Sequence, residues 1–186
     1  MRVNFVGELG WELHHPVEYQ NHIFDQLMEA GKEFSLKPYG IRAMNSLRVE
    51  KSYKLVGTEL SIEYSPYESG LDRFVHPNKG DFIGRAALDK WRAKGFSNKL
   101  VTMEIHGVTN ADVLGNNPIY DNGSVIGRAT SGDFGFRLNK SIALGMVKPE
   151  FAEVGQKLKI DILGKMHEAS IVEESPYDAE NKLIRA

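Results

Sequence analysis

The sequence predicts an α+β protein: an α+β part up to about residue 96, followed by a small antiparallel β-barrel or sandwich. Two observations predict this order. Apolar residues recur at helical spacing in the first half. After Lys99 the chain changes to short runs of high β propensity that are separated by turn residues. The composition, 41% hydrophobic and 26% charged over 186 residues, is that of a soluble folded chain.

The opening segment predicts a hairpin-like unit. Alternating residues in 2–6 and 11–15 indicate two strands, and Gly7-Glu8-Leu9-Gly10 forms the turn between them. The first strand has no turn or cap before it, so we expect the chain to begin inside a longer domain.

Three helices are expected in the first part. The first covers 17–32, with Gly31 as its C-terminal cap and with these residues buried: Ile23, Phe24, Leu27, Met28 and Ala30. The second covers about 39–53, and its expected buried residues are Ile41, Met44, Leu47 and Val49. Its charged residues should face solvent or a site: Arg42, Arg48, Glu50 and Lys51. The third helix covers 85–94.

The stretches between these helices and the second half complete the prediction. We expect a loop over 55–63, a short strand over 71–75 and a linker over 95–98. Six β runs then follow, over 100–106, 118–120, 124–130, 142–147, 157–163 and 166–172. The glycine-bearing stretch 127–132 resembles a phosphate cradle, although a turn between strands is the better interpretation.

Charge and composition exclude several classes of function. The 23 basic and 25 acidic residues give a net charge of −2, so no overall field attracts nucleic acid or an anionic membrane. The absence of cysteine excludes disulfides and thiolate metal sites and fits a reducing compartment. Residues 1–6 also lack the apolar region of a signal peptide, so we expect a cytoplasmic or matrix-type location. No apolar run approaches the ~20 residues that a membrane span needs.

Glu8 is the clearest candidate for binding. It lies between two glycines at the tip of the expected hairpin, where a carboxylate can accept paired N–H donors; a solvated turn glutamate is the alternative. Arg48 and Glu50 are either a functional pair or ions on a helix surface. His14 and His15 should point to opposite faces of a strand, so we expect no shared metal.

Seven segments in order resemble one protein family. They are residues 5–13 (FVGELGWEL), 43–51 (AMNSLRVEK), 57–59 (GTE), 66–71 (PYESGL), 81–88 (DFIGRAAL), 127–132 (GRATSG) and 140–145 (KSIALG). Together they resemble the aminomethyltransferases, that is, the glycine-cleavage T-protein and its relatives. Residues 46–51 and 57–59 are nearest to the folate modules of dimethylglycine and sarcosine dehydrogenases or oxidases.

The resemblance implies a fold and a ligand. Residues 1–96 would be the C-terminal part of the folate-binding domain, and residues 97–186 the family's C-terminal barrel. Tetrahydrofolate would bind with its pterin ring on Glu8, in the turn that contains Gly10, and Tyr177 would approach from the tail of the barrel. Family members carry an arginine for the anionic glutamyl tail where this chain has Met44-Asn45. Arg48 is then the candidate to replace that arginine.

The resemblance also implies a partner and a reaction. The family's catalytic aspartate lies upstream of this chain, so we expect no catalytic residue here and a missing N-terminal half or flavoprotein domain, with any FAD in that separate domain. The reaction would transfer one carbon from a glycine, dimethylglycine or sarcosine type amine to tetrahydrofolate. Two alternatives remain open: a stand-alone folate-binding or regulatory module without catalysis, and a structural piece without a ligand.

Overall fold

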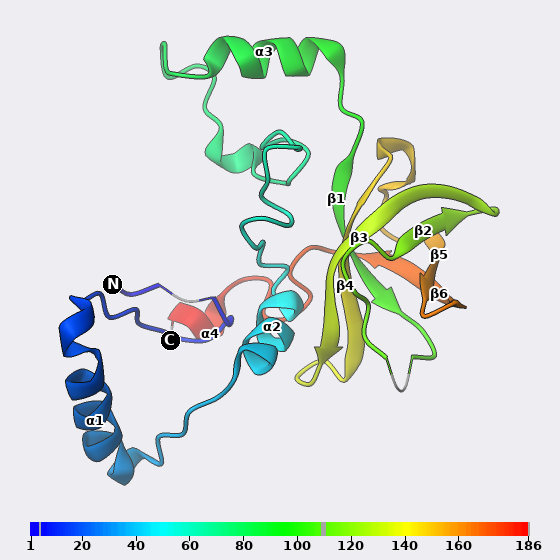
Figure 1. Ribbon diagram of the computed structural model, residues 1–186. Helices are drawn as coiled ribbons and strands as arrows, with labels where there is room; N and C mark the ends of the chain where they lie inside the picture. Colours follow the sequence, from blue (N-terminus) through cyan, green and yellow to red (C-terminus); the bar gives the residue numbers. More distant parts are fainter. Residues whose placement is uncertain (4, 109–110, 186) are drawn as a thin grey trace.

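The computed structural model describes residues 1–3, 5–108 and 111–185, and a closed antiparallel β-barrel forms one side of it (Figure 1). The barrel strands are β1 (Lys99–Ile105), β2 (Pro118–Asp121), β3 (Ser124–Gly135), β4 (Lys140–Val147), β5 (Lys157–Ile162) and β6 (Lys165–Val172). Around the barrel they follow the order β1-β4-β3-β2-β5-β6. The predicted antiparallel barrel is confirmed. None of the described helices is long and apolar enough to cross a membrane.

Alternating apolar side chains from the strands fill the barrel. Met103, Ile119 and Ile160 are fully buried there, and burying each side chain of this size contributes about 1.5–3 kcal/mol. Two hairpins close on two-residue turns, Asn122-Gly123 and Leu163-Gly164, whose residues all have the positive φ that such tight turns need. The core therefore follows directly from the β pattern of the sequence.

Strand β3 is longer than the sequence predicted. It continues to Gly135, so the stretch 127–132 lies inside a strand and is neither a phosphate cradle nor a turn between strands. Its glycines serve close packing instead. A Cβ on Gly132 would lie 2.5 Å from the Cβ of Val113, and a Cβ on Gly135 would lie 2.7 Å from the Cγ of Glu50. The turn interpretation failed because glycine also marks places where another chain segment approaches a strand closely.

Helix α2 (Ile41–Glu50) packs against β3 and β4. The predicted buried face was right at Val49, which is 0% exposed, and wrong at Ile41, which is 76% exposed. Arg48 and Glu50, expected at solvent or a site, are buried. The reason is that the barrel offers polar partners along its rim. Ser46, for example, donates its hydroxyl to the carbonyl of Phe134 at 2.6 Å.

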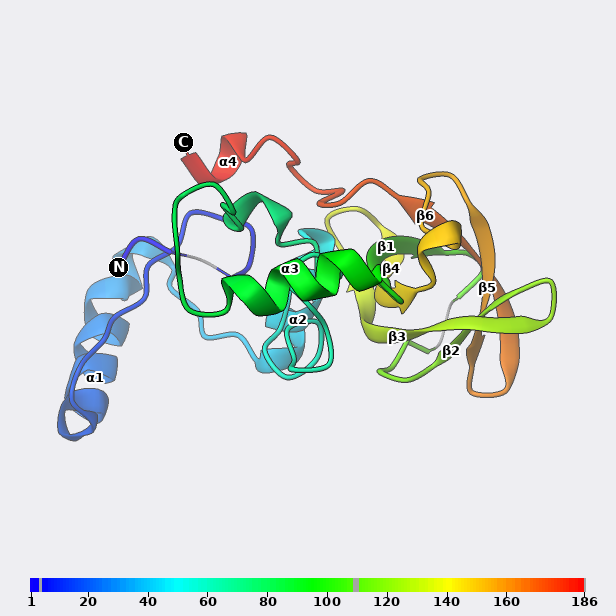
Figure 2. The same cartoon turned by 90° about the horizontal axis from the view of Figure 1, so that it is seen from above.

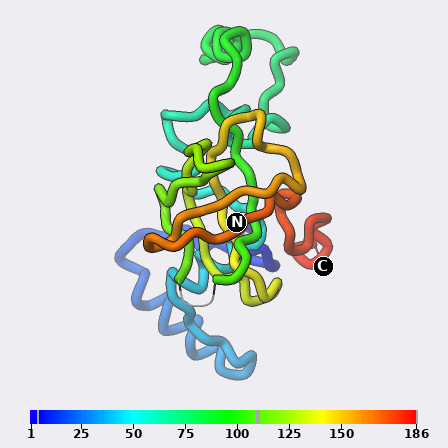
Figure 3. Tube along the Cα trace, turned by 90° about the vertical axis from the view of Figure 1, so that its right-hand side faces the viewer, coloured from blue at the N-terminus to red at the C-terminus, as the bar shows by residue number. Residues whose placement is uncertain are grey.

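Helix α1 (Gln20–Ala30) continues between two 3-10 turns, Val17–Tyr19 and Gly31–Phe34, and lies far from the barrel (Figures 1 and 3). None of its residues is buried in the described structure, and Phe24 and Leu27 are 54% and 45% exposed, so the predicted burial of its apolar face was wrong. The helical period was right, but the described segments cover the face that it creates only in part: Ile23 and Met28 are half-buried. Gly31 follows the helix with φ −77, while Ser35 takes the left-handed conformation.

The predicted strands over 11–15 and 71–75 were also wrong, as was the part of the strand over 2–6 that the structure describes; residue 4 lies outside the described residues. Met1 and Glu12 exchange two backbone hydrogen bonds, of 2.7 and 2.9 Å, but no ladder follows in the described residues. Asp72–Phe74 is a 3-10 helix. The loop over 55–63 and α3 (Arg85–Lys94) are confirmed. Seen from above, α3 lies in front of α2 (Figure 2). The domain boundary at 96/97 stays a prediction.

A short helix near the C-terminus brings the two chain ends together. This helix, α4 (Lys182–Arg185), lies near the N-terminus in Figure 1, and Arg2 donates to the carbonyl of Ile184 at 3.2 Å. The Asp178 carboxylate accepts the N–H groups of Lys182 and Leu183 at 2.8 and 3.2 Å, which caps the start of α4. The tail is thereby held beside the first residues.

Buried glutamates fasten the loops after α2 to the barrel. Glu59, 0% exposed, accepts hydrogen bonds from the Ser131 hydroxyl of β3 at 2.5 Å and from Arg48 at 3.4 Å. Burial alone would raise the pKa of Glu59, but these and other donors outweigh it and lower that pKa below its usual value.

Glu68 makes the same kind of attachment at the entry to β1. Its carboxylate accepts the backbone N–H groups of Ser97 and Asn98 at 3.2 and 3.1 Å, as well as the N–H and hydroxyl of Ser65 at 3.0 and 2.9 Å. Burial raises its pKa, but the hydrogen bonds prevail and the pKa is lowered. Both glutamates therefore bind the barrel best as carboxylates.

Candidate functional site

Four segments that are distant in sequence meet around Glu8: the turn 7–10, the end of α2, the connection 136–139 between β3 and β4, and the tail 173–181. Gly7 makes this meeting possible. It has φ +72, and a Cβ there would overlap the side chain of Lys51, which passes directly beneath it. Only glycine satisfies both conditions without strain.

Two side chains hold the Glu8 carboxylate. Arg137 donates from Nη1 to Oε1 at 2.5 Å, and the Tyr177 hydroxyl donates to the same oxygen at 3.1 Å. The Glu8 side chain remains 44% exposed. The Glu8 carboxylate is therefore fixed in direction but still accessible to solvent. It is not the freely solvated turn glutamate that was the alternative prediction.

Arg137 connects Glu8 to the interior. Its Nε pairs with the fully buried carboxylate of Glu50, its Nη2 donates to the Leu47 carbonyl at 2.7 Å, and its own backbone N–H donates to Glu50 at 2.7 Å. Burial lowers the pKa of Arg137, but its bonds to Glu50 and Glu8 outweigh this and raise it above the ordinary value. The guanidinium is thus a permanent cation shared by two carboxylates.

Tyr177 covers this cation. Its ring centroid lies 3.8 Å from the Arg137 guanidinium carbon, a cation–π contact, and its backbone N–H donates to the Glu50 carbonyl at 3.0 Å. Burial, together with the hydrogen bond to Glu8, raises the pKa of the Tyr177 hydroxyl. The hydroxyl therefore stays a donor through neutral pH.

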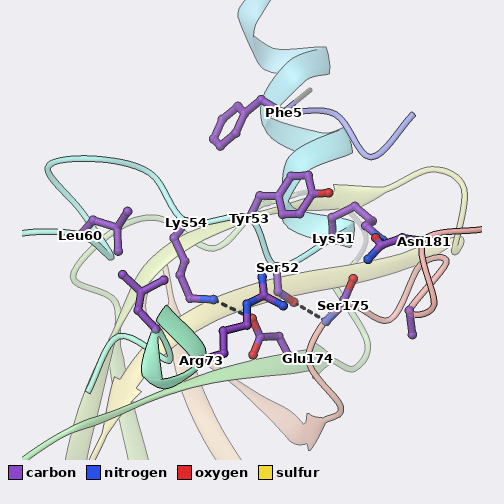
Figure 4. A pocket seen from close by; sticks show the side chains of 12 residues that line it. Phe5, Lys51, Ser52, Tyr53, Lys54, Leu60, Arg73, Glu174, Ser175 and Asn181 are labelled. Carbon is purple, nitrogen blue, oxygen red and sulfur yellow. Dashed lines mark hydrogen bonds and ion pairs between the residues drawn. The ribbon is translucent and has the colours of Figure 1, made fainter. Parts of the chain in front are cut away.

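A cavity of about 470 Å³ lies next to this cluster (Figure 4). Lys51, which supports Gly7, also lines the cavity, and its ammonium donates to the Asp178 carbonyl and to Asn181 at 2.7 and 2.9 Å. The other walls come from four places in the chain: Phe5, the stretch 52–54, Leu60 with Leu71 and Arg73, and the tail residues Glu174, Ser175, Ala179 and Asn181. The cavity is of the size that small-molecule sites have.

The remaining predicted residues lie as follows. Gly10 is partly buried at the end of the Glu8 turn. Arg48 is 2% exposed, so the prediction of a helix-surface ion was wrong. It donates to Asn45 Oδ1 at 2.9 and 2.7 Å, to the Tyr53 carbonyl at 3.0 Å and to Glu59, and its pKa is lowered by burial. The structure places Arg48 in this buried network and not in the Glu8 cluster.

Sequence reasoning missed Arg137 and the role of Lys51. Arg137 stands in a connection between two strands, where charged residues are ordinary, so no local pattern singles it out. The sequence contained a weak indication of a role for Lys51, because this residue follows α2 directly and ends the segment 43–51 that carries part of the family resemblance. Its burial to 1% depends on Gly7, 44 residues earlier in the numbering, and no periodicity shows this.

No metal centre emerges in the parts of the chain that the structure describes, since no group of three or more histidine, aspartate or glutamate side chains could hold an ion there. His14 and His15 are both exposed. The Nε2 of His14 lies 3.3 Å from Glu12, and the Nδ1 of His15 lies 2.8 Å from the carbonyl of Pro16. Each histidine thus has a local partner.

Fold and site together define a class of protein with two parts. A segment of helices and loops packs against a closed antiparallel barrel, and a fixed carboxylate lies where the two parts meet. Two family models match this chain. The model described as the GCVT N-terminal domain matches residues 1–79, and the model described as the glycine cleavage T-protein C-terminal barrel domain matches residues 98–178. The chain belongs to the aminomethyltransferase family, that of the glycine-cleavage T-protein.

Relatives and a solved structure agree with this assignment. The chain is 39% identical over 175 residues to human mitochondrial dimethylglycine dehydrogenase, covering 94% of the chain and 20% of that protein. It is 36% identical over 171 residues to an aminomethyltransferase of Desulfitobacterium hafniense, covering 92% of the chain and 46% of that protein. The crystal structure of the glycine cleavage system aminomethyltransferase T from Bartonella henselae superposes with a TM-score of 0.85 at 24% identity, over 96% of this chain and 49% of that one, and supports the fold.

Proposed function

We propose that this chain binds tetrahydrofolate through Glu8 and serves a folate-dependent one-carbon transfer. The observation that carries the proposal is the orientation of the Glu8 carboxylate, which is held on one oxygen by Arg137 and Tyr177 while the side chain stays 44% exposed. A pterin ring presents N3–H and its 2-amino group as two parallel donors. A fixed carboxylate matches such a pair of donors.

The described residues fit such a ligand. Glu8 supplies the acceptor oxygens, Arg137 and Tyr177 hold it in place, and the cavity beside them offers aromatic and charged walls. When bound, tetrahydrofolate supplies the two nitrogens that take up the one-carbon unit. The part of these residues is to orient the cofactor and to limit the access of water, and both favour a reaction between two bound partners.

We extend the proposal to a longer enzyme. The chain spans 20% of the human dehydrogenase and 46% of the bacterial aminomethyltransferase, and we infer that it acts as the C-terminal part of such a protein. The donor would be a glycine, dimethylglycine or sarcosine type amine, and any FAD would bind a separate domain. A cytoplasmic location stays a prediction.

Calorimetric titration of the chain with tetrahydrofolate tests the proposal. We expect saturable binding that weakens about 10- to 100-fold in Glu8→Gln, because an amide turns a donor toward the donors of the pterin and loses charge-assisted hydrogen bonds worth about 1.5–3 kcal/mol. Glu168→Gln, a change of the same kind at a 61% exposed glutamate on β6, should bind like the wild type. Absence of binding by the wild type, or equal binding by Glu8→Gln, would disprove the role of Glu8.

A further inference from the structure

Residues 11–39 form an arm that contains α1 and lies away from the barrel (Figure 1). Nine large apolar side chains of this arm are at least 45% exposed. They are Trp11, Leu13, Val17, Tyr19, Phe24, Leu27, Phe34, Leu36 and Tyr39. A large exposed apolar surface on a folded protein marks a place where another polypeptide or a membrane binds.

The apolar residues of α1 lie on one stripe of the helix. With about 100° per residue, four of them fall within about 140° of one another around the helix axis: Ile23, Phe24, Leu27 and Met28. Ile23 and Met28, at the edges of the stripe, are half-buried, whereas Phe24 and Leu27, in its middle, are 54% and 45% exposed. The described segments therefore leave the centre of the stripe uncovered. A helix of 11 residues is marginal in water by itself, so α1 would be stabilised by a cover on this stripe.

A hollow of about 540 Å³ lies beside the stripe. Ile23 lines it from α1, and Met1 and the stretch 12–15, which includes Leu13, line it from the start of the chain. The Met1 ammonium donates to the Glu12 carbonyl at 2.7 Å, which holds the first residue at this place. A covering segment would thus find an apolar recess next to the stripe of α1.

The charge of the arm narrows the choice of what covers it. The arm carries five acidic and two basic residues. A second copy of this chain would bring two net-negative arms together, and an anionic membrane would repel the arm. The complementary surface is therefore an apolar patch with a basic rim on a different polypeptide.

The relatives indicate which polypeptide this is. The chain matches 46% of the aminomethyltransferase of Desulfitobacterium hafniense, so more than half of that protein has no counterpart in this chain. The barrel model that matches residues 98–178 is the family's C-terminal domain, which places the unmatched part on the N-terminal side.

We propose that the stripe of α1 and the hollow beside it are the docking surface for the N-terminal half of an aminomethyltransferase fold. The inference rests on the proposed function, in which this chain acts as the C-terminal part of a longer enzyme. It assigns the contact to Leu13, Phe24 and Leu27. None of these three residues lines the cavity beside the Glu8 cluster.

Amide hydrogen exchange, followed by mass spectrometry, tests this surface in the 186-residue chain and in a fusion. In the fusion, this chain follows the part of the Desulfitobacterium hafniense aminomethyltransferase that precedes the 171 matched residues. We expect the amides of α1 to exchange at least about 100-fold more slowly in the fusion than in the chain alone, because a covered helix opens less often.

Matched lysine variants of the fusion show whether the stripe makes the contact. Leu27→Lys should speed exchange of the α1 amides by about 10- to 100-fold, the factor that corresponds to the burial of one leucine side chain. Lysine forms helices about as well as leucine, so the helix itself should persist. Leu163→Lys, the same substitution at an 81% exposed leucine in the turn between β5 and β6, should leave the exchange of α1 unchanged.

These measurements contain no folate, so the inference and the proposed function can fail separately. Glu8→Gln should weaken tetrahydrofolate binding and leave the exchange of α1 in the fusion unchanged. Equal exchange of α1 in the chain and the fusion, equal effects of the two lysine variants, or a fusion that does not fold would each overturn the docking surface. Protection of α1 that grows with the concentration of the unfused chain would show that a second copy binds there. Protection by phosphatidylglycerol vesicles would show a membrane-binding face, and either result would also overturn the proposal.

Discussion

Replacing Arg137 by methionine gives the sharpest test of how the barrel is joined to α2. The substitution keeps a long side chain but removes the cation that pairs with Glu50, whose side chain is 0% exposed. Loss of one partner of a buried ion pair costs about 3–5 kcal/mol. Glu50 would still accept the backbone N–H groups of Arg137 and Leu138, at 2.7 and 3.1 Å. We therefore expect the lower end, about 3 kcal/mol.

Urea unfolding, followed by circular dichroism, measures this effect. With an m-value of about 2 kcal/mol/M, the midpoint should fall by about 1.5 M. Arg42→Met is the matched control, because its 87% exposed guanidinium lies 3.5 Å from Asp112 and should change stability by no more than about 0.5 kcal/mol. The double variant Arg137→Met/Glu50→Gln should lose less than Arg137→Met alone, since it leaves no buried charge unpaired.

One result would refute the reasoning about Arg137. If Arg137→Met lost no more stability than Arg42→Met, the Glu50–Arg137 pair would not fasten the β3–β4 connection to α2. A double variant less stable than Arg137→Met would contradict the argument as well, because it would show that an uncompensated carboxylate is not the source of the loss.

Two further predictions concern Glu68 at the entry to β1 and the packing of Gly135 against Glu50 of α2. The folded pKa of Glu68 is lowered below its unfolded value of about 4.3, so the stability that this carboxylate contributes is complete above that pH and is lost as the pH falls through the folded pKa. Urea midpoints measured from pH 6 to 2.5 should therefore fall less in Glu68→Gln than in the wild type. Equal slopes of midpoint against pH in the two proteins would contradict this. Gly135→Ala should destabilise the chain by about 1–3 kcal/mol in urea, because the new methyl group would lie 2.7 Å from a buried glutamate side chain. Gly40→Ala, whose methyl group would have nothing within 4 Å, should cost less than about 1 kcal/mol, through the loss of a glycine at the N-cap of α2. Similar losses in both variants would rule out the packing explanation.

The barrel was predictable because its signals are local. Two hairpins form where short β-rich runs are joined by Asn122-Gly123 and by the turn before Lys165. Such hairpins depend only on residues that are neighbours in the sequence. The end of β3 was not predictable, since Gly132 is typical of a turn and only its pairing with Ala143 of β4 shows that it lies in a strand. The helix over 17–32 was found for the same local reason, but its burial was not, because burial needs a second surface.

The candidate site was predictable only in part. Glu8 stood out because two glycines flank it, and the family resemblance named it and Tyr177. Nothing along the chain indicated that Arg137 would join them, 129 residues from Glu8. Arg48 misled for the opposite reason: its position on a charged helix suggested solvent, while the structure surrounds it with Asn45, Glu59 and the Tyr53 carbonyl.

The sequence by itself determined the family, the antiparallel barrel and the glycine-flanked carboxylate, since each depends on the order and spacing of neighbouring residues. The tertiary structure alone decided which charges are buried and which of them meet. A buried ion is stable only when an opposite charge or a donor from another segment satisfies it. Glu50, Glu59 and Glu68 look like ordinary surface glutamates until the barrel closes against them.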